Sequence, residues 1–189
     1  MKRKKITVEQ LLQRYAAGER NFTNVEVEYT EEGLSGCNLS GANLSGSKFN
    51  CTYLIGTDFS NADLSGVQMA ERCLNKANLS GANLSGANLW QSLFEGSNLS
   101  GANLSGADLR WANLVRSNLS GANLNGANLH GTNFYGSDLS GVNLSNTFLE
   151  GTSLPKVNLM GANLEGAKLE QVNFEDTIMP DGSIRNDGC

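Results

Sequence analysis

The chain has 189 residues, of which 39% are hydrophobic and 7% aromatic, and its formal net charge is −5. This length fits one domain, and the apolar content with only two prolines argues against a disordered chain. The net charge has the wrong sign for a nucleic-acid-binding protein and is too small to argue strongly for a mimic of DNA.

Residues 1–19 are predicted to form a basic start and a short capping α-helix. Thr7 and Gln10 have the spacing of a capping box, and Gly18 supplies a stop. The apolar residues that fall on one face of this helix are Val8, Leu11, Leu12 and Tyr15. We expect that face to cover the open end of the region that follows.

The basic start MKRKK is typical of a signal peptide, but the segment after it is amphipathic rather than continuously apolar. No apolar run is long enough to span a membrane. The sequence therefore predicts a cytoplasmic protein without a membrane partner.

A period of five dominates the rest of the chain. Every fifth residue from Leu34 to Met179 is Leu, Phe or Met, giving thirty consecutive centres. The residue two before each centre is nearly always small, with Glu32 and Arg72 as exceptions, and the commonest segment reads Ala-Asn-Leu-Ser-Gly. This period fits neither an α-helix nor a regular strand, but it fits a short extended segment with two inward side chains followed by a corner. Such a chain coils and stacks, because a single repeat has no core of its own.

Departures from the commonest segment recur in adjacent pairs every 20 residues, which predicts four segments in each coil. The pairs are centred at Phe49/Leu54, Met69/Leu74, Leu89/Phe94, Leu109/Leu114, Leu129/Phe134, Leu149/Leu154 and Leu169/Phe174. Four segments per coil collect these departures on two neighbouring faces, here named the varied faces. The other two are the plain faces.

The segments resemble the A(D/N)LXX motif of the pentapeptide-repeat family, as in Ala42-Asn43-Leu44 and Ala62-Asp63-Leu64. The resemblance covers about residues 20–180 and implies an all-β solenoid, a right-handed quadrilateral β-helix. Arrays rich in Asn-Leu-Ser-Gly are similar to those of cyanobacterial members, which suggests a bacterial host.

Phe22 and Val27 are predicted to be two further centres, separated from the main register by a two-residue bulge or loop at 28–33. Including them, we expect about eight coils. The tail 181–189 has no evident cap, so either the last coil exposes a strand edge or the tail lies over it. The resemblance implies that an exposed edge could support a homodimer through the C-terminal coil.

Cys37, Cys51, Cys73 and Cys189 lack metal-ligand spacing, so we expect free thiols, with Cys37 pointing inward. A disulfide between Cys51 and Cys73 is disfavoured, because they are predicted to lie across a corner and one coil apart. We expect no cofactor and no metal site.

His130 is the only histidine, and the register predicts Arg110 and Glu150 beside it, with Trp90 one coil further. This column could be an acid–base cluster, but a solvated row of opposite charges is the favoured interpretation. Flat faces offer no concave site, so we do not expect an enzyme.

The favoured function is a non-enzymatic scaffold that binds another protein through the varied faces. Aromatic residues and arginine are enriched where proteins bind one another. The candidate binding residues are Tyr53, Ile55, Trp90, Leu93, Arg110, Trp111, Val115, Arg116, His130, Tyr135 and Phe148.

Two other interpretations stay open. The family resemblance implies a DNA mimic that modulates DNA gyrase or another topoisomerase, but the plain faces hold few acidic residues, namely Asp58, Asp63, Asp138, Glu165 and Asp181. The second interpretation is a passive structural role. In each case we expect no direct binding of nucleic acid.

Overall fold

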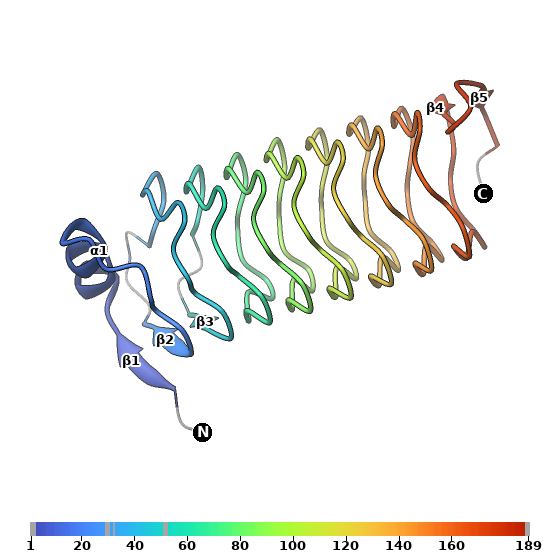
Figure 1. The fold of residues 1–189 in the computed structure, drawn as a ribbon. Helices are drawn as coiled ribbons and strands as arrows, with labels where there is room; N and C mark the ends of the chain where they lie inside the picture. Colours follow the sequence, from blue (N-terminus) through green and yellow to red (C-terminus); the bar gives the residue numbers. More distant parts are fainter. Residues whose placement is uncertain (1–2, 29–30, 32, 51–52, 188–189) are drawn as a thin grey trace.

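The structure, a computed structural model, describes residues 3–28, 31, 33–50 and 53–187. Its regular elements are short and lie at the two ends of a long coil (Figure 1). They are β1 (Lys4–Ile6), α1 (Val8–Ala16), β2 (Val25–Val27), β3 (Lys48–Phe49), β4 (Thr177–Ile178) and β5 (Ile184–Arg185). Strands β1, β2 and β3 pair in parallel in that order, whereas β4 and β5 are antiparallel.

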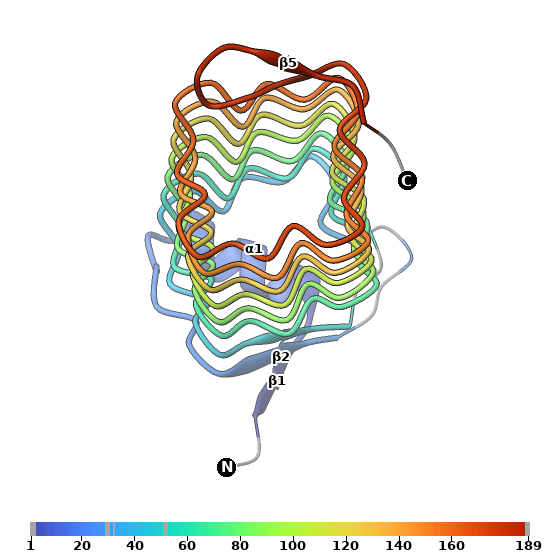
Figure 2. The ribbon, with the colours of Figure 1, turned by 90° about the vertical axis from the view of Figure 1, so that its right-hand side faces the viewer.

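Between the ends, successive coils pair through single parallel bridges that join residues 20 apart. One such column runs from Asn83 to Asn103 and on to Asn123. Four five-residue segments therefore make one coil, as predicted, and the end-on view has four sides (Figure 2). Few of these segments qualify as regular strands, because a turn interrupts the extended backbone every five residues. The expected all-β solenoid is thus a stack of bridges with few strands.

We number the faces by their centres. Face 1 contains Leu54 and Leu74, face 2 Phe59 and Leu79, face 3 Leu64 and Leu84, and face 4 Met69 and Leu89. Faces 4 and 1 are the varied faces, and faces 2 and 3 are the plain faces.

The centres form the core. Each one from Leu34 to Leu159 is at most 1% exposed, and burial of such a side chain stabilises the fold by about 1.5–3 kcal/mol. In the last coil Leu164, Leu169 and Met179 are only partly buried, because no further coil covers them completely.

Each corner is a hydrogen-bonded turn. In the turn after Leu99, the Ala102 N–H donates to the Leu99 carbonyl at 3.0 Å, and Gly101 has a φ of 65°. A positive φ at the third residue of such a turn is the reason for glycine there. The Asn98 side-chain oxygen accepts from the Ser100 N–H at 3.1 Å, which explains the asparagine before each leucine.

Small polar residues two before a centre also have a defined role. The Thr132 hydroxyl donates to the Leu109 carbonyl at 2.9 Å, and Ser117 donates to the Phe94 carbonyl at 2.8 Å. Arg72, an exception to the small-residue rule, donates from Nε to the equivalent Phe49 carbonyl at 2.8 Å. Glu32, the other exception, lies outside the described residues.

The N-terminal cap is confirmed. Thr7 and Gln10 form a capping box, and Leu11 is fully buried against the first coil. The Tyr15 hydroxyl donates to the Ser40 carbonyl at 2.8 Å, which ties α1 to face 2. Strand β1 was not predicted. Its buried Ile6 pairs with Val27, so the basic start adds a strand to face 4.

The two-residue interruption is also confirmed by the register. Val27 pairs with Phe49, 22 residues later, whereas Asn38 pairs with Asp58, 20 residues later. The extra residues therefore fall between Val27 and Leu34. Three residues of this segment lie outside the described part of the chain, namely Tyr29, Thr30 and Glu32.

The C-terminal tail caps half of the last coil, so of the two arrangements left open from the sequence each holds for one half. Strand β5 folds back on β4, and the Phe174 N–H donates to the Asp187 carbonyl at 2.9 Å. The tail therefore covers the edge of faces 1 and 2, and Figure 2 shows β5 lying along one side of the last coil. On faces 3 and 4, among described residues, the N–H groups of Leu164 and Leu169 have no hydrogen-bond partner.

The described residues contain no helix with the length and apolar character needed to cross a membrane.

Ser97 provides a test of the corner hydrogen bonds. Its hydroxyl is the one buried side-chain polar atom in the described part of the chain without a hydrogen bond. Ser117 is equivalent, and its hydroxyl is bonded. We expect Ser117→Ala to destabilise the protein by about 1 kcal/mol and Ser97→Ala to be neutral or stabilising. Thermal unfolding measures both, and equal losses would contradict this account.

Candidate partner-binding surface

The register brings the candidate residues into columns on faces 4 and 1. Tyr53 and Leu93 lie in one column of face 1, with Cys73 between them. All eleven side chains lie on these two faces or their corners, where Trp90, Val115 and His130 are half-buried and the others exposed.

Exposed apolar side chains concentrate on the varied faces. Of the eight large hydrophobic residues exposed in the described part of the chain, six are candidates, namely Tyr53, Ile55, Leu93, Trp111, Tyr135 and Phe148. The other two are Met160 on face 2 and Ile184 in the tail. The apolar surface is therefore one-sided.

Six of the eleven candidates fall into two groups. Tyr53, Ile55 and Leu93 lie on face 1 in the N-terminal half, whereas Trp111, His130 and Phe148 lie on face 4 and its corner in the C-terminal half. The Trp111 and His130 rings meet edge to face, with centroids 5.1 Å apart. The sequence placed all of these on neighbouring faces but did not predict the ring contact.

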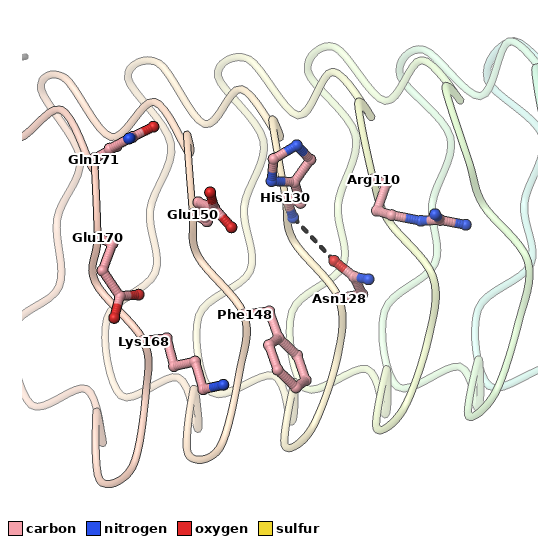
Figure 3. A pocket seen from close by; sticks show the side chains of 8 residues that line it. All are labelled: Arg110, Asn128, His130, Phe148, Glu150, Lys168, Glu170 and Gln171. Carbon is pink, nitrogen blue, oxygen red and sulfur yellow. Dashed lines mark hydrogen bonds between the residues drawn. The ribbon is translucent and has the colours of Figure 1, made fainter.

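The C-terminal group borders a shallow, open groove of about 690 Å³ on face 4 (Figure 3). Its lining residues are Arg110, Asn128, His130, Phe148, Glu150, Lys168, Glu170 and Gln171. Asn128, Glu170 and Gln171 were not singled out from the sequence. Asn128 lies two residues before His130 in the same coil, and Glu170 and Gln171 lie on the same face two coils further, which was the signal that could have found them.

Arg110 is held by its own coil. Its guanidinium donates two hydrogen bonds to the Asp108 carboxylate, at 2.8 and 2.7 Å. The hydrogen bond from Arg110 lowers the pKa of Asp108 and keeps it charged. Arg110 extends away from His130 in Figure 3.

Within the described residues, no salt bridge joins Glu150 to His130 or to Arg110. The predicted column is therefore present, but its members are not linked as an acid–base unit. The favoured interpretation of a simple row of charges was only partly right, because Arg110 pairs with Asp108 and His130 contacts Trp111.

Trp111 occupies an unfavourable backbone position. Its φ is 61°, a region that side chains other than glycine and asparagine rarely adopt. The ring lies over Gly131 of the next coil, where a Cβ atom would overlap it. Glycine at 131 therefore makes room for the Trp111 ring.

The plain faces are organised differently, by ladders of side-chain amides. On face 3, Asn83 donates to Asp63 at 3.1 Å and Asn103 to Asn83 at 3.2 Å, and the ladder continues to Asn163. On the varied faces, the described residues contain one equivalent step, from Asn88 to Gln68 at 3.3 Å. Outward groups on the plain faces are thus bonded to one another along the coil.

Cys37 and Cys73 are free thiols. Cys37 is partly buried against the core, as predicted, and burial raises its pKa. Cys51, the other member of the disfavoured pairing with Cys73, and Cys189 lie outside the described residues. No group of three or more metal-ligating side chains is gathered among the residues that are described.

The model of pentapeptide repeats matches the chain with eight copies, over residues 34–71, 77–114, 102–141 and 137–176. The chain belongs to the pentapeptide-repeat family. Members of this family form right-handed quadrilateral β-helices. No curated protein matches the chain.

Three solved structures illustrate the likeness. HetL, a pentapeptide-repeat protein involved in heterocyst differentiation regulation in the cyanobacterium Nostoc, is 29% identical over 95% of this chain and 100% of HetL, with a TM-score of 0.43. QnrB1, a plasmid-mediated fluoroquinolone resistance protein, is 22% identical over 83% of this chain and 71% of its own, with a TM-score of 0.51. A pentapeptide-repeat protein from the thylakoid lumen of Arabidopsis thaliana is 34% identical over 61% of this chain and 66% of its own, with a TM-score of 0.41.

The contact between Trp111 and Gly131 can be tested with matched glycine variants. Gly121 has nearly the same φ as Gly131, 65° against 67°, but open space around its Cβ position. We expect Gly121→Ala to cost about 1–2 kcal/mol from backbone strain, and Gly131→Ala to cost more because it displaces the Trp111 ring. Unfolding and Trp fluorescence in a Trp90→Phe background measure both effects. Equal costs with unchanged fluorescence would contradict the contact.

Proposed function

We propose that this chain is a non-enzymatic scaffold, a right-handed four-sided solenoid of about eight coils, that binds another protein through faces 4 and 1. One observation carries the proposal. Bulky and charged residues occupy the left-handed corner position on the varied faces, where backbone strain opposes them.

Eleven described residues other than glycine have a positive φ, and each lies two positions after a centre. On the plain faces these are Asn24, Asn61 and Asn146, and asparagine tolerates this conformation. On the varied faces they are Glu71, Lys76, Gln91, Trp111, Arg116, Lys156, Gln171 and Asp176. Each of these costs about 1–3 kcal/mol relative to an unstrained backbone. Drift without selection gives no reason for this cost to accumulate on two adjacent faces, whereas a binding role does.

The chemistry of the varied faces also supports a protein partner. Trp, Tyr and Arg dominate the energetics of protein interfaces, and Trp111, Tyr135 and Arg116 are exposed here. The plain faces engage their amides in ladders along the coil, so fewer of their polar groups are available to a partner.

A binding role fits the groove better than catalysis does. The groove is open to solvent, and its single histidine contacts a tryptophan rather than a carboxylate. Enzymes bind substrates in concave sites with converging polar groups. We place the scaffold in the cytoplasm, a location that the free thiols of Cys37 and Cys73 favour.

The DNA-mimic alternative receives less support from the charges. Asp58, Asp63 and Asp138 on the plain faces each accept a hydrogen bond from an asparagine of the next coil. They are the acceptor ends of amide ladders, and this local role accounts for them. A duplex presents one charge per about 1.7 Å, far denser than these carboxylates.

The test is capture of partners by wild type and by a variant in which Trp90, Arg110, Trp111 and Tyr135 are all changed to serine. A matched control changes four outward residues of the plain faces, as Met160→Ser with Ser85→Ala, Ser105→Ala and Ser120→Ala. Circular dichroism first establishes that both variants fold. We expect the first variant to lose, by about tenfold or more, a protein that wild type and the control retain.

Purified DNA gyrase is tested in parallel with the lysate. Capture of the same proteins by all three forms would contradict binding through the varied faces. Gyrase bound by wild type and by the first variant, but lost when Asp58, Asp63 and Asp138 are changed to asparagine, would favour the DNA-mimic alternative.

We further propose a weak homodimer through the uncovered half of the last coil. The free N–H groups of Leu164 and Leu169 form an open edge that a second chain can pair with. Glu165 and Glu170 of the uncovered half are exposed and would meet their copies, so like charges oppose this contact.

Sedimentation over a range of protein and salt concentrations tests the dimer. We expect association to strengthen with salt, which screens the carboxylates, and to be lost in Leu169→Pro, which removes an edge donor. Ile184→Ser, an exposed tail residue at the same end, is the control and should still dimerise. A monomer under all conditions, or a dimer unaffected by Leu169→Pro, would rule out this interface.

A further inference from the structure

Three cations recur at one position along the corner between faces 1 and 2. Lys76, Arg116 and Lys156 each lie two residues after a face 1 centre, and 40 residues separate each from the next. Since 20 residues make one coil, the three occupy alternate coils. Two strand spacings place neighbouring cations about 9.6 Å apart along the coil axis.

All three occupy the strained corner position, with φ values of 59°, 54° and 57°. Lys76 and Arg116 are each followed one coil later by a glycine, Gly96 and Gly136. A Cβ atom added to Gly96 would lie 3.9 Å from the Lys76 Cγ, and one added to Gly136 would lie 3.7 Å from the Arg116 Cγ. These two coils give a long side chain a glycine to lie over, whereas Lys156 is followed one coil later by Asp176. Face 1 thus has a regular array of cations where glycine would be less strained.

Within the described residues, no ion pair includes Lys76, Arg116 or Lys156, whereas Arg110 pairs with Asp108 at 2.7 Å. The side chain of Tyr135, followed by the carboxylates of Asp176 and Glu175, raises the pKa of Lys156 and keeps it protonated at neutral pH. None of the three side chains is committed to an ion pair, although Lys156 also contacts the Tyr135 side chain.

Apolar and aromatic side chains lie beside the row on face 1. Val115 directly precedes Arg116, and the exposed Tyr135 lies one coil further, with its ring centroid 5.7 Å from the Lys156 Nζ. A partner that binds the cations along the axis also reaches this apolar strip.

We propose that Lys76, Arg116 and Lys156 recognise an acidic amphipathic α-helix that lies along the coil axis and presents carboxylates at i, i+7 and i+14. Seven residues of α-helix rise about 10.5 Å, close to the spacing of the row and within the reach of flexible lysine and arginine side chains. An extended strand fits less well, because its side chains on one face repeat about every 6.6 or 13.2 Å. The proposal rests on the proposed function and specifies the partner of face 1.

Charge complementarity explains why an acidic partner would choose this corner. The chain as a whole carries a net charge of −5, so its net charge by itself disfavours an acidic helix. Unpaired cations along one corner then select the orientation and position of the helix.

The experiment measures peptide binding by fluorescence anisotropy. One helical peptide of about 20 residues carries glutamates at i, i+7 and i+14 beside leucines, and a second of identical composition has the glutamates at i, i+5 and i+10, around the helix. We expect wild type to bind the first about tenfold more tightly than the second, with affinity falling as salt increases.

Two variants with substitutions to glycine, a row variant and a control, test the role of the cations. Lys76→Gly, Arg116→Gly and Lys156→Gly together remove the row while relieving strain, so folding is preserved. The control combines Asn61→Gly, Asn146→Gly and Gln171→Gly, three uncharged residues at the same corner position. We expect the row variant to lose about tenfold in affinity for the first peptide and the control to change by less than about twofold.

Three results would overturn the proposal. They are equal affinity for both peptides, unchanged binding by the row variant, and tighter binding of a DNA duplex of equal charge through the same three residues. The partner-capture variant leaves Lys76, Arg116 and Lys156 unchanged. Failure with peptides while that variant still loses a protein would therefore remove the acidic helix and leave the proposed function standing.

Discussion

The left-handed corner turn is the constraint on which the rest of this fold depends. At every fifth residue the chain turns a corner with a positive φ, as at Gly101. The turn closes with a hydrogen bond from the Ala102 N–H to the Leu99 carbonyl. Because the turn comes so often, the extended segments are too short to be regular strands, and cohesion comes from stacking one coil on the next. Buried centres and bonds between coils then repeat without change along the chain.

The same constraint makes departures from glycine informative. In an α-helix or a flat sheet, a surface substitution has little effect on the backbone. Here a residue such as Trp111 or Arg116 at the corner is strained, and this strain is what supports the proposed binding role. The plain faces avoid this strain, and their asparagine ladders stabilise the coil along its length. One half of the perimeter serves cohesion, and the other supports our proposal of binding.

The two ends solve the problem of an open coil differently. At the N-terminus, α1 covers the core and β1 extends face 4 with the charged residues Lys4 and Lys5. Charged edge strands discourage pairing with other chains. At the C-terminus the β4–β5 hairpin covers only half of the last coil, which leaves Leu164 and Leu169 partly exposed. The rod is therefore closed at one end and half open at the other.

The sequence alone determined the five-residue register, the four segments per coil, the capping box at Thr7 and the outward position of all eleven candidate residues. A strict period leaves one solution for which side chains point inward, and so these features follow without coordinates. Only the tertiary structure decided the pairing of β1 with β2, the return of the tail over Phe174, the contact of Trp111 with His130 and the pairing of Arg110 with Asp108. These depend on non-repeating termini and on side-chain directions between coils, which a period in the sequence does not encode.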